Sequence, residues 1–300
     1  MPENVELGLT VRVGCHMVYE TKARTPALFL IKPRRNEQQR VDQERLHFRP
    51  GLPATEFQDA LGNIVHRAIL QPGDNVIHHD ALVSVKSEFD YLTGPGEPVP
   101  LSLLPPAFLR YTLPSRYCDS DKLMNFAWQQ FGTTRHGVER VRAICDWVHH
   151  NIEYRFGAGR PDISASEILA QRFGVCRDYA HVAISLCRAF NLPTRYVTGH
   201  LPDIGYKDPG TPMDFHAYFE VYLDHKWLTF DARYNIPRLG RIKVAHGLDA
   251  VDGAITTIYG EAPLKWFEVW AYQVNPEQVS VGDPVDLSKR LDGTETVRYS

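Results

Sequence analysis

The sequence predicts an α+β protein, with a β-rich N-terminal part followed by a core of helices and antiparallel strands. Short runs between residues 7 and 90 alternate apolar and polar positions and are separated by turn residues. Apolar residues recur with helical spacing over 120–151 and again over 176–190. Residues 216–231 alternate on both sides of a tight turn, which is typical of a β-hairpin.

The N-terminal part contains several short predicted strands. Apolar residues occupy every second position from Leu7 to Val13, as in a half-buried strand. Further strands are predicted at 27–31, 64–70 and 79–89, with turns at 62–63 and 72–75, and the basic segment 32–40 is interpreted as a solvated loop. Short strands at this spacing suggest a sandwich or a curled sheet.

A proline-rich segment divides the chain. Gly and Pro punctuate residues 94–106 without any periodicity, which predicts a linker. We therefore expect a β-rich N-terminal domain over 1–100 and a second domain over 101–300.

Helices open the second part. Ser120 or Asp121 is suited to cap a helix that runs to Phe131, and a second helix follows Gly137 and ends near Asn151. Ser164 and Glu167 have the spacing of a capping box before a short helix. Beyond the helix that starts at Cys176, strands are predicted at 194–199 and 266–272, besides the hairpin.

Cys176 is the first candidate for chemistry. The Gly174-Val175 turn delivers it to the first turn of a helix, where backbone N–H groups and the helix dipole favour the nucleophilic thiolate. The other four cysteines, at 15, 118, 145 and 187, are interpreted as packing residues.

His216 and Asp231 lie on the two strands of the predicted hairpin. With Asp224-His225 as a two-residue loop, Leu223 faces Lys226 and Asp231 becomes a diagonal neighbour of His216 on the same face. A three-residue loop without a bulge would put them on opposite faces. A cysteine nucleophile, a histidine base and an aspartate that orients the imidazole form the Cys/His variant of the catalytic triad.

Four segments in this order resemble the bacterial transglutaminase-like superfamily, most strongly over residues 150–237. They are 174–181 (GVCRDYAH), 193–199 (PTRYVTG), 215–218 (FHAY) and 230–232 (FDA). The resemblance implies a papain-like core, with the nucleophile helix packed on an antiparallel sheet. It also implies a triad of Cys176, His216 and Asp231, with Tyr154 near an aromatic position that could shape the oxyanion region.

The resemblance implies amide acyl chemistry through a thioester. Hydrolysis of a protein or peptide amide is the first hypothesis, and transamidation of protein glutamine by the same triad is the second. A non-catalytic binding or scaffold protein on this fold is the third. We expect no cofactor and no metal, and the Gly/Pro-rich loop from Tyr206 to Asp214 is a hypothetical substrate gate.

Composition excludes other classes of protein. The formal net charge of −3, from 33 basic and 36 acidic residues, argues against a nucleic-acid partner. No apolar run reaches the roughly 18 residues of a membrane span. Five widely spaced cysteines are typical of reduced thiols, so the expected compartment is the cytoplasm.

Overall fold

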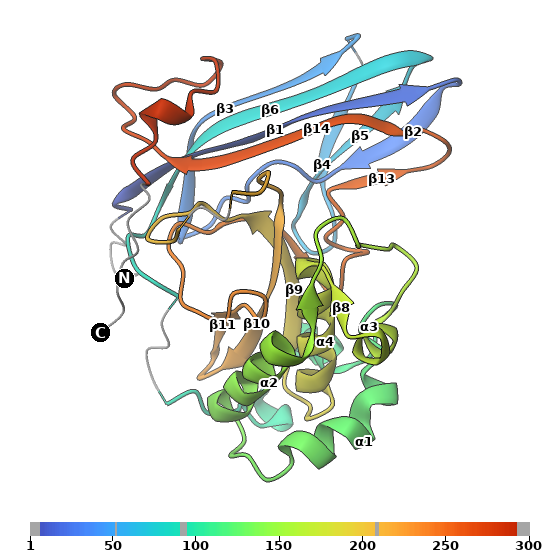
Figure 1. Cartoon of the computed structure of the whole chain (residues 1–300), viewed down its shortest axis with the longest axis vertical. Coiled ribbons are helices and arrows are strands. Elements are labelled where there is room, and N and C mark those ends of the chain that lie inside the picture. The colour runs from blue at the N-terminus through green and yellow to red at the C-terminus, as the bar shows by residue number, and fades with distance from the viewer. Residues whose placement is uncertain (1–6, 52, 91–94, 208–209, 293–300) are drawn as a thin grey trace.

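The structure is a computed structural model that describes residues 7–51, 53–90, 95–207 and 210–292. Two parts lie one above the other in Figure 1: strands of the N-terminal half in the upper part, and a mixed helical and stranded core below. The α+β class expected from the sequence is confirmed.

Two antiparallel sheets form the upper part. The first has the order β14-β1-β6-β3, and the second has the order β13-β2-β5-β4. Their strands are β1 (Leu9–Thr21), β2 (Thr25–Phe29), β3 (Gln39–Arg49), β4 (Thr55–Gln58), β5 (Ile64–Leu70), β6 (Gly73–Val85), β13 (Thr256–Ile258) and β14 (Leu264–Gln273).

An apolar core fills the space between these two sheets. Met17 on β1 and Ile77 on β6 pack in one cluster with Phe29 on β2, and all three side chains are almost fully buried. The alternation that predicted a sandwich therefore has its physical cause in a shared interior.

The C-terminal strands do not join the sheet of the core. β14 pairs with β1, for example Val13 with Ala271, and β13 pairs with β2. The sequence analysis had assigned residues 101–300 to the core, and residues 256–273 instead complete the two upper sheets. The sequence carried no sign of this, because a strand's pattern shows that it is half-buried but not which strand it pairs with.

β3 was not predicted, and part of the expected loop at 32–40 belongs to it. Its eleven residues carry charged side chains and most of them are at least partly exposed, so the apolar alternation is weak. It lies at the edge of its sheet, where exposed charged residues are common. β6 also starts earlier than expected, at Gly73 inside the predicted turn.

The lower part is built around one helix. The described helices of the core are α1 (Ser120–Phe131), α2 (Val138–Asn151), α3 (Ala165–Gln171) and α4 (Cys176–Arg188), preceded by the short 3-10 helices η1 (Leu101–Leu103) and η2 (Pro106–Thr112). α4 contacts the other three helices and also packs on β9 and β10. These helices begin and end within two residues of the predicted positions.

The sheet beneath α4 is antiparallel, with the order β11-β10-β9-β12. Its strands are β9 (Thr194–His200), β10 (His216–Leu223), β11 (Lys226–Phe230) and β12 (Ile242–Gly247). A two-residue parallel pair, β7 (Glu153–Tyr154) with β8 (Phe173–Gly174), precedes α4, and a last 3-10 helix, η3, spans Leu287–Lys289. Among the described helices, none is long and apolar enough to cross a membrane.

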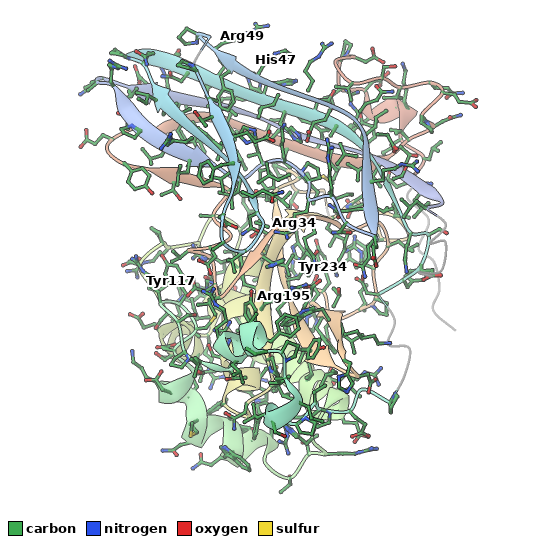
Figure 2. The ribbon with its side chains drawn as sticks, turned by 180° about the vertical axis from the view of Figure 1, so that it is seen from behind. Arg34, His47, Arg49, Tyr117, Arg195 and Tyr234 are labelled. Atoms are coloured by element: carbon green, nitrogen blue, oxygen red, sulfur yellow. The ribbon has the colours of Figure 1, made fainter. Side chains whose placement is uncertain are left out.

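Hydrogen bonds fasten the two parts together along β12. The Gln39 side chain donates to the Lys243 carbonyl at 2.8 Å and accepts from the Lys243 N–H at 2.8 Å. Asn63 makes the equivalent pair of bonds with the backbone of His246. Figure 2 shows Arg34, from the upper part, above Arg195 of β9 at this junction.

Candidate active site

Cys176 is held at the first turn of α4 by the segment that precedes it. The carboxylate of Asp178 is fully buried and accepts the Val175 N–H at 2.9 Å. A Cβ atom at Gly174 would lie 2.7 Å from the Asp178 side chain, so only glycine fits there. Asp178 therefore caps the helix and fixes the turn that presents Cys176.

The hairpin has the predicted register. Asp224 and His225 have φ of 48° and 60°, as a two-residue turn of this type requires, and Leu223 pairs with Lys226. The last pair is Phe219 with Phe230, so Asp231 follows directly on β11. His216 Nε2 donates to Asp231 Oδ2 at 2.7 Å, which is the contact expected from the diagonal relation.

The Asp231 carboxylate has three further partners. Its Oδ1 accepts the backbone N–H groups of Arg233 at 3.0 Å and Tyr234 at 3.2 Å. Its Oδ2 also accepts from Arg241 Nη2 at 2.9 Å, and the Arg241 side chain is only 6% exposed. Arg241 Nε donates in turn to Asp90 at 2.5 Å.

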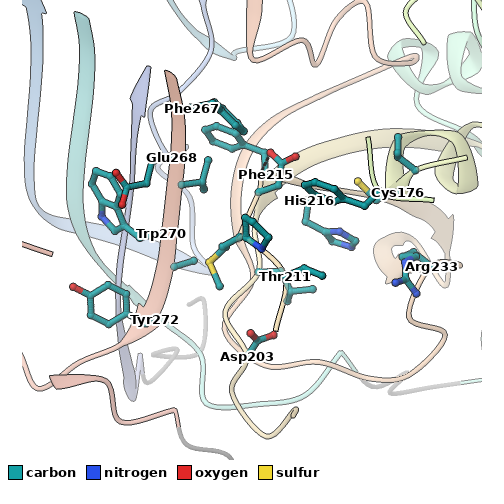
Figure 3. Close-up of a pocket in the computed structure, with 18 of the residues that line it drawn as sticks. Cys176, Asp203, Thr211, Phe215, His216, Arg233, Phe267, Glu268, Trp270 and Tyr272 are labelled. Carbon is teal, nitrogen blue, oxygen red and sulfur yellow. Dashed lines mark hydrogen bonds between the residues drawn. The ribbon is translucent and has the colours of Figure 1, made fainter. Parts of the chain in front are cut away.

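Cys176 and His216 line one cavity of about 620 Å³ between the two parts of the protein. Figure 3 shows them on one wall, with Phe267 of β14 across from them. The Cys176 sulfur accepts the backbone N–H of Ala217, the neighbour of His216. Because Nε2 of His216 is engaged by Asp231, Nδ1 is the nitrogen that remains to exchange a proton with the thiol.

Burial sets the protonation states of this group. It raises the pKa of the Cys176 thiol to about 12, and the N–H groups of Ala217 and Arg177 oppose this shift without reversing it. Burial also lowers the pKa of His216, with Asp231 opposing and Arg241 reinforcing the shift. The pKa of Asp231 lies far below its usual range because His216 and Arg241 outweigh its burial.

These directions correct one expectation from the sequence. The helix N-terminus was expected to favour the thiolate, but loss of water around the sulfur outweighs the helix dipole. The resting site therefore pairs a protonated thiol with a neutral imidazole, and a general base is needed to release the nucleophile.

The cavity wall is assembled from both parts. Tyr154 and Arg233 lie on the core side, and the Arg233 guanidinium packs 3.7 Å from the centre of the Tyr154 ring. Phe215 of the core and Phe267 of β14 stack obliquely, with ring centres 6.3 Å apart. Because β14 supplies one wall, the cavity depends on the pairing of β14 with β1.

The structure assigns further residues to the site that sequence analysis did not single out. Arg241 comes ten residues after Asp231 in a Gly/Pro-interrupted loop, and no sequence signal connects them. Asp214 lines the cavity, and its position two residues before His216 is a usable signal, because such residues share a face in extended chain. Of the proposed gating loop, residues 211–214 line the cavity, residues 208–209 lie outside the described part, and gating stays a prediction.

No metal site accompanies this geometry: within the described ranges, no group of three or more His, Cys, Asp or Glu side chains is arranged to hold an ion.

Comparison with known proteins agrees with this architecture. Residues 125–232 match the sequence model of the transglutaminase-like superfamily. The crystal structure of a "putative cysteine protease" from Cytophaga hutchinsonii has a TM-score of 0.82 and 32% sequence identity, covering 89% of this chain and 91% of that one.

Two relatives extend the comparison by sequence. An uncharacterized protein of Mycobacterium tuberculosis is 28% identical over 227 residues, which cover 67% of this chain and 70% of the relative. Human kyphoscoliosis peptidase is 31% identical over 106 residues, which cover 32% of this chain and 16% of that protein.

A cysteine at a helix N-terminus, facing a His–Asp pair carried by a hairpin, places the molecule in a class of cysteine-dependent catalytic folds. The chain belongs to the transglutaminase-like superfamily.

Proposed function

We propose that this protein is a cysteine hydrolase that cleaves an amide bond of a protein or peptide substrate through a thioester. Cys176 is the nucleophile, His216 the general base and acid, and Asp231 the residue that orients the imidazole. The observation that carries the proposal is the 2.7 Å His216–Asp231 hydrogen bond in the same cavity as Cys176. The cavity is large enough for a substrate segment.

The reaction follows from these positions. The Cys176 sulfur attacks the amide carbon while its proton passes to His216 Nδ1, and the imidazolium is stabilised by Asp231. As the C–N bond breaks, the proton moves from Nδ1 to the leaving amine, and a thioester remains on Cys176. Water then attacks the thioester with His216 again as base, which releases the acid and restores the thiol.

The negative charge on the carbonyl oxygen requires hydrogen-bond donors. Backbone N–H groups in the first turn of α4 are the nearest source, because such groups have no partner one turn earlier in the helix. Tyr154 lines the same cavity and acts electrostatically on Cys176, which supports a role for its hydroxyl in shaping this region.

Hydrolysis is preferred over transamidation because two relatives carry protease or peptidase in their names. Transamidation uses the same thioester and differs only in the attacking group. The five cysteines are all free thiols, which supports a reducing compartment such as the cytoplasm.

The test is digestion of a peptide library by the wild type and by Cys176→Ala and His216→Ala, with products identified by mass spectrometry. We expect cleavage by the wild type, none with C176A, and a rate lower by roughly 10²–10⁴-fold with H216A. His150→Ala is the matched control, because His150 is exposed at the end of α2. Product formation unaffected by C176A would contradict the proposal, and diversion of the product to an amide by added methylamine would favour transamidation.

A further inference from the structure

Asp214 is a carboxylate in the active-site cavity that the proposed reaction does not use. It lines the cavity with Cys176 and His216, and its side chain is open to that space. Its Oδ1 accepts the N–H of Phe215 at 2.7 Å, which fixes its position next to the strand that carries His216. Its charge acts on both Cys176 and Tyr154, so it lies close to the reacting sulfur.

No cation neutralises Asp214 among the residues that the structure describes. Its pKa is raised by burial, and the opposing influence is the backbone N–H of Phe215 rather than an arginine or a lysine. Other charged groups of the cavity are differently placed: Asp203 pairs with Arg238, and Arg233 lies over the Tyr154 ring. A carboxylate in this situation is stabilised by a cation that comes from outside the protein.

Apolar surface lies next to this charge. Met213 and Phe215 flank Asp214 in sequence, and both line the cavity. Phe267 on β14 faces Cys176 across the cavity and is 41% exposed. Together they form a site for a group with an aliphatic stem and a positive end, which is the chemistry of lysine and arginine side chains.

We propose that Asp214 is a specificity residue that binds the cationic side chain of a lysine or arginine in the substrate, close to the scissile amide. The inference rests on the proposed function for its substrate, since it names the class of peptide that the Cys176 site accepts. It assigns Asp214 no part in bond making or breaking.

The first test needs no substrate. Cys176 is the partly exposed cysteine, and the other four are buried, so small thiol reagents label it selectively. The probes are two methanethiosulfonates, one with a trimethylammonium and one with a sulfonate group. Each forms a mixed disulfide with the Cys176 sulfur and releases methanesulfinate. Both attack the same thiolate, so the ratio of their rates cancels the thiolate fraction and reports the local charge.

We expect the cation-to-anion rate ratio, normalised to 2-mercaptoethanol, to exceed one in the wild type. It should fall about five- to tenfold in Asp214→Asn, as expected for removal of one nearby charge. Glu268→Gln is the matched control, because Glu268 lies on the side of β14 turned away from Cys176 (Figure 3). A ratio that is the same in D214N and in the wild type would overturn the inference.

The second test uses peptide pairs with arginine or citrulline at one position near the scissile bond. Citrulline keeps the size and the donors of arginine but has no charge. We expect kcat/KM to favour arginine about five- to tenfold in the wild type and in E268Q, and equally for both peptides in D214N. Equal cleavage of both peptides by the wild type, at every position scanned, would overturn the inference and leave the hydrolase proposal standing.

The two proposals fail separately. If the wild type cleaves no peptide while the reagent ratio still depends on Asp214, hydrolysis is contradicted and cation binding is supported. The ammonium of an attacking amine has the same chemistry as a lysine side chain. A preference that appears only when methylamine competes with water, and never in kcat/KM for the peptide, would assign Asp214 to an amine acceptor and overturn the side-chain assignment.

Discussion

At the scale of single residues, Asp231 determines how His216 can act. Its two oxygens accept four hydrogen bonds, of which one comes from His216 and one from Arg241. These contacts hold the carboxylate ionised and the imidazole in the tautomer that leaves the Nδ1 lone pair toward the cavity.

The first prediction concerns this tautomer. In Asp231→Asn the amide can present its NH₂ group to His216 Nε2, which stabilises the tautomer with the proton on Nδ1 and removes the base. We expect kcat for peptide cleavage to fall by roughly 10²–10⁴-fold with a much smaller change in KM. Steady-state kinetics give the answer, with Glu268→Gln as a control; an unchanged kcat would exclude Asp231 from the triad.

The second prediction concerns pH. The active form has a neutral His216, and burial lowers the pKa of this residue below its ordinary value of about 6.5. As pH falls, His216 therefore stays neutral through pH 6.5, and activity is lost only at lower pH. We expect the acid limb of kcat/KM against pH to have its midpoint below 6.5.

Arg241 contributes to this shift, because its charge opposes formation of the imidazolium. Arg241→Met should move the acid limb to higher pH, whereas Arg241→Lys keeps the charge and should leave the limb closer to its wild-type position. Melting curves of both variants separate this effect from loss of fold. An acid limb that coincides in R241M and the wild type would show that Arg241 has only a structural role.

At the scale of elements, the start of α4 depends on one close contact. Gly174 allows the chain to pass against Asp178, and Asp178 caps the helix by accepting the Val175 N–H. The nucleophile is the next residue along, so the geometry of the turn is also the geometry of the reaction.

The third prediction tests that contact. In Gly174→Ala, the new methyl group would lie 2.7 Å from the Asp178 side chain and must displace it. We expect a loss of about 1–3 kcal/mol in the free energy of unfolding and a lower kcat. Gly51→Ala serves as the control, since nothing lies within 4 Å of the added atom. Denaturant titration and kinetics that match the wild type would show that the turn tolerates a side chain.

At the scale of the whole molecule, the cavity exists because the chain returns to its beginning. β14 is added to β1 at the edge of the first upper sheet, and its Phe267 side forms the wall opposite Cys176. On the opposite side of this strand, Trp270 and Tyr272 are buried in a cluster with Leu82 of β6.

The fourth prediction follows from this return. A fragment of residues 101–300 would lose β1 and β6, so the buried aromatic residues of β14 would be exposed to water. We expect it to bind a hydrophobic dye or aggregate, and to regain a cooperative thermal transition when produced together with residues 1–100. A fragment that melts cooperatively by itself would instead support the division at residue 100 as two independent domains.

The sequence was sufficient for the helices of the core and for the hairpin register. Those features depend on neighbours along the chain: the apolar spacing that begins at Cys176, and the two-residue turn at Asp224-His225. β3 escaped because an exposed edge strand has little apolar alternation to detect.

By itself, the sequence determined the α+β class, the family and the order of Cys176, His216 and Asp231, because each is written in local spacing and short motifs. Only the tertiary structure decided that β14 closes the cavity, that Arg241 reaches Asp231 and that burial raises the pKa of the Cys176 thiol. These features depend on which distant segments meet and on how much water they exclude. No local pattern specifies either, since a half-buried strand can pair with many partners and a thiol responds to everything that surrounds it.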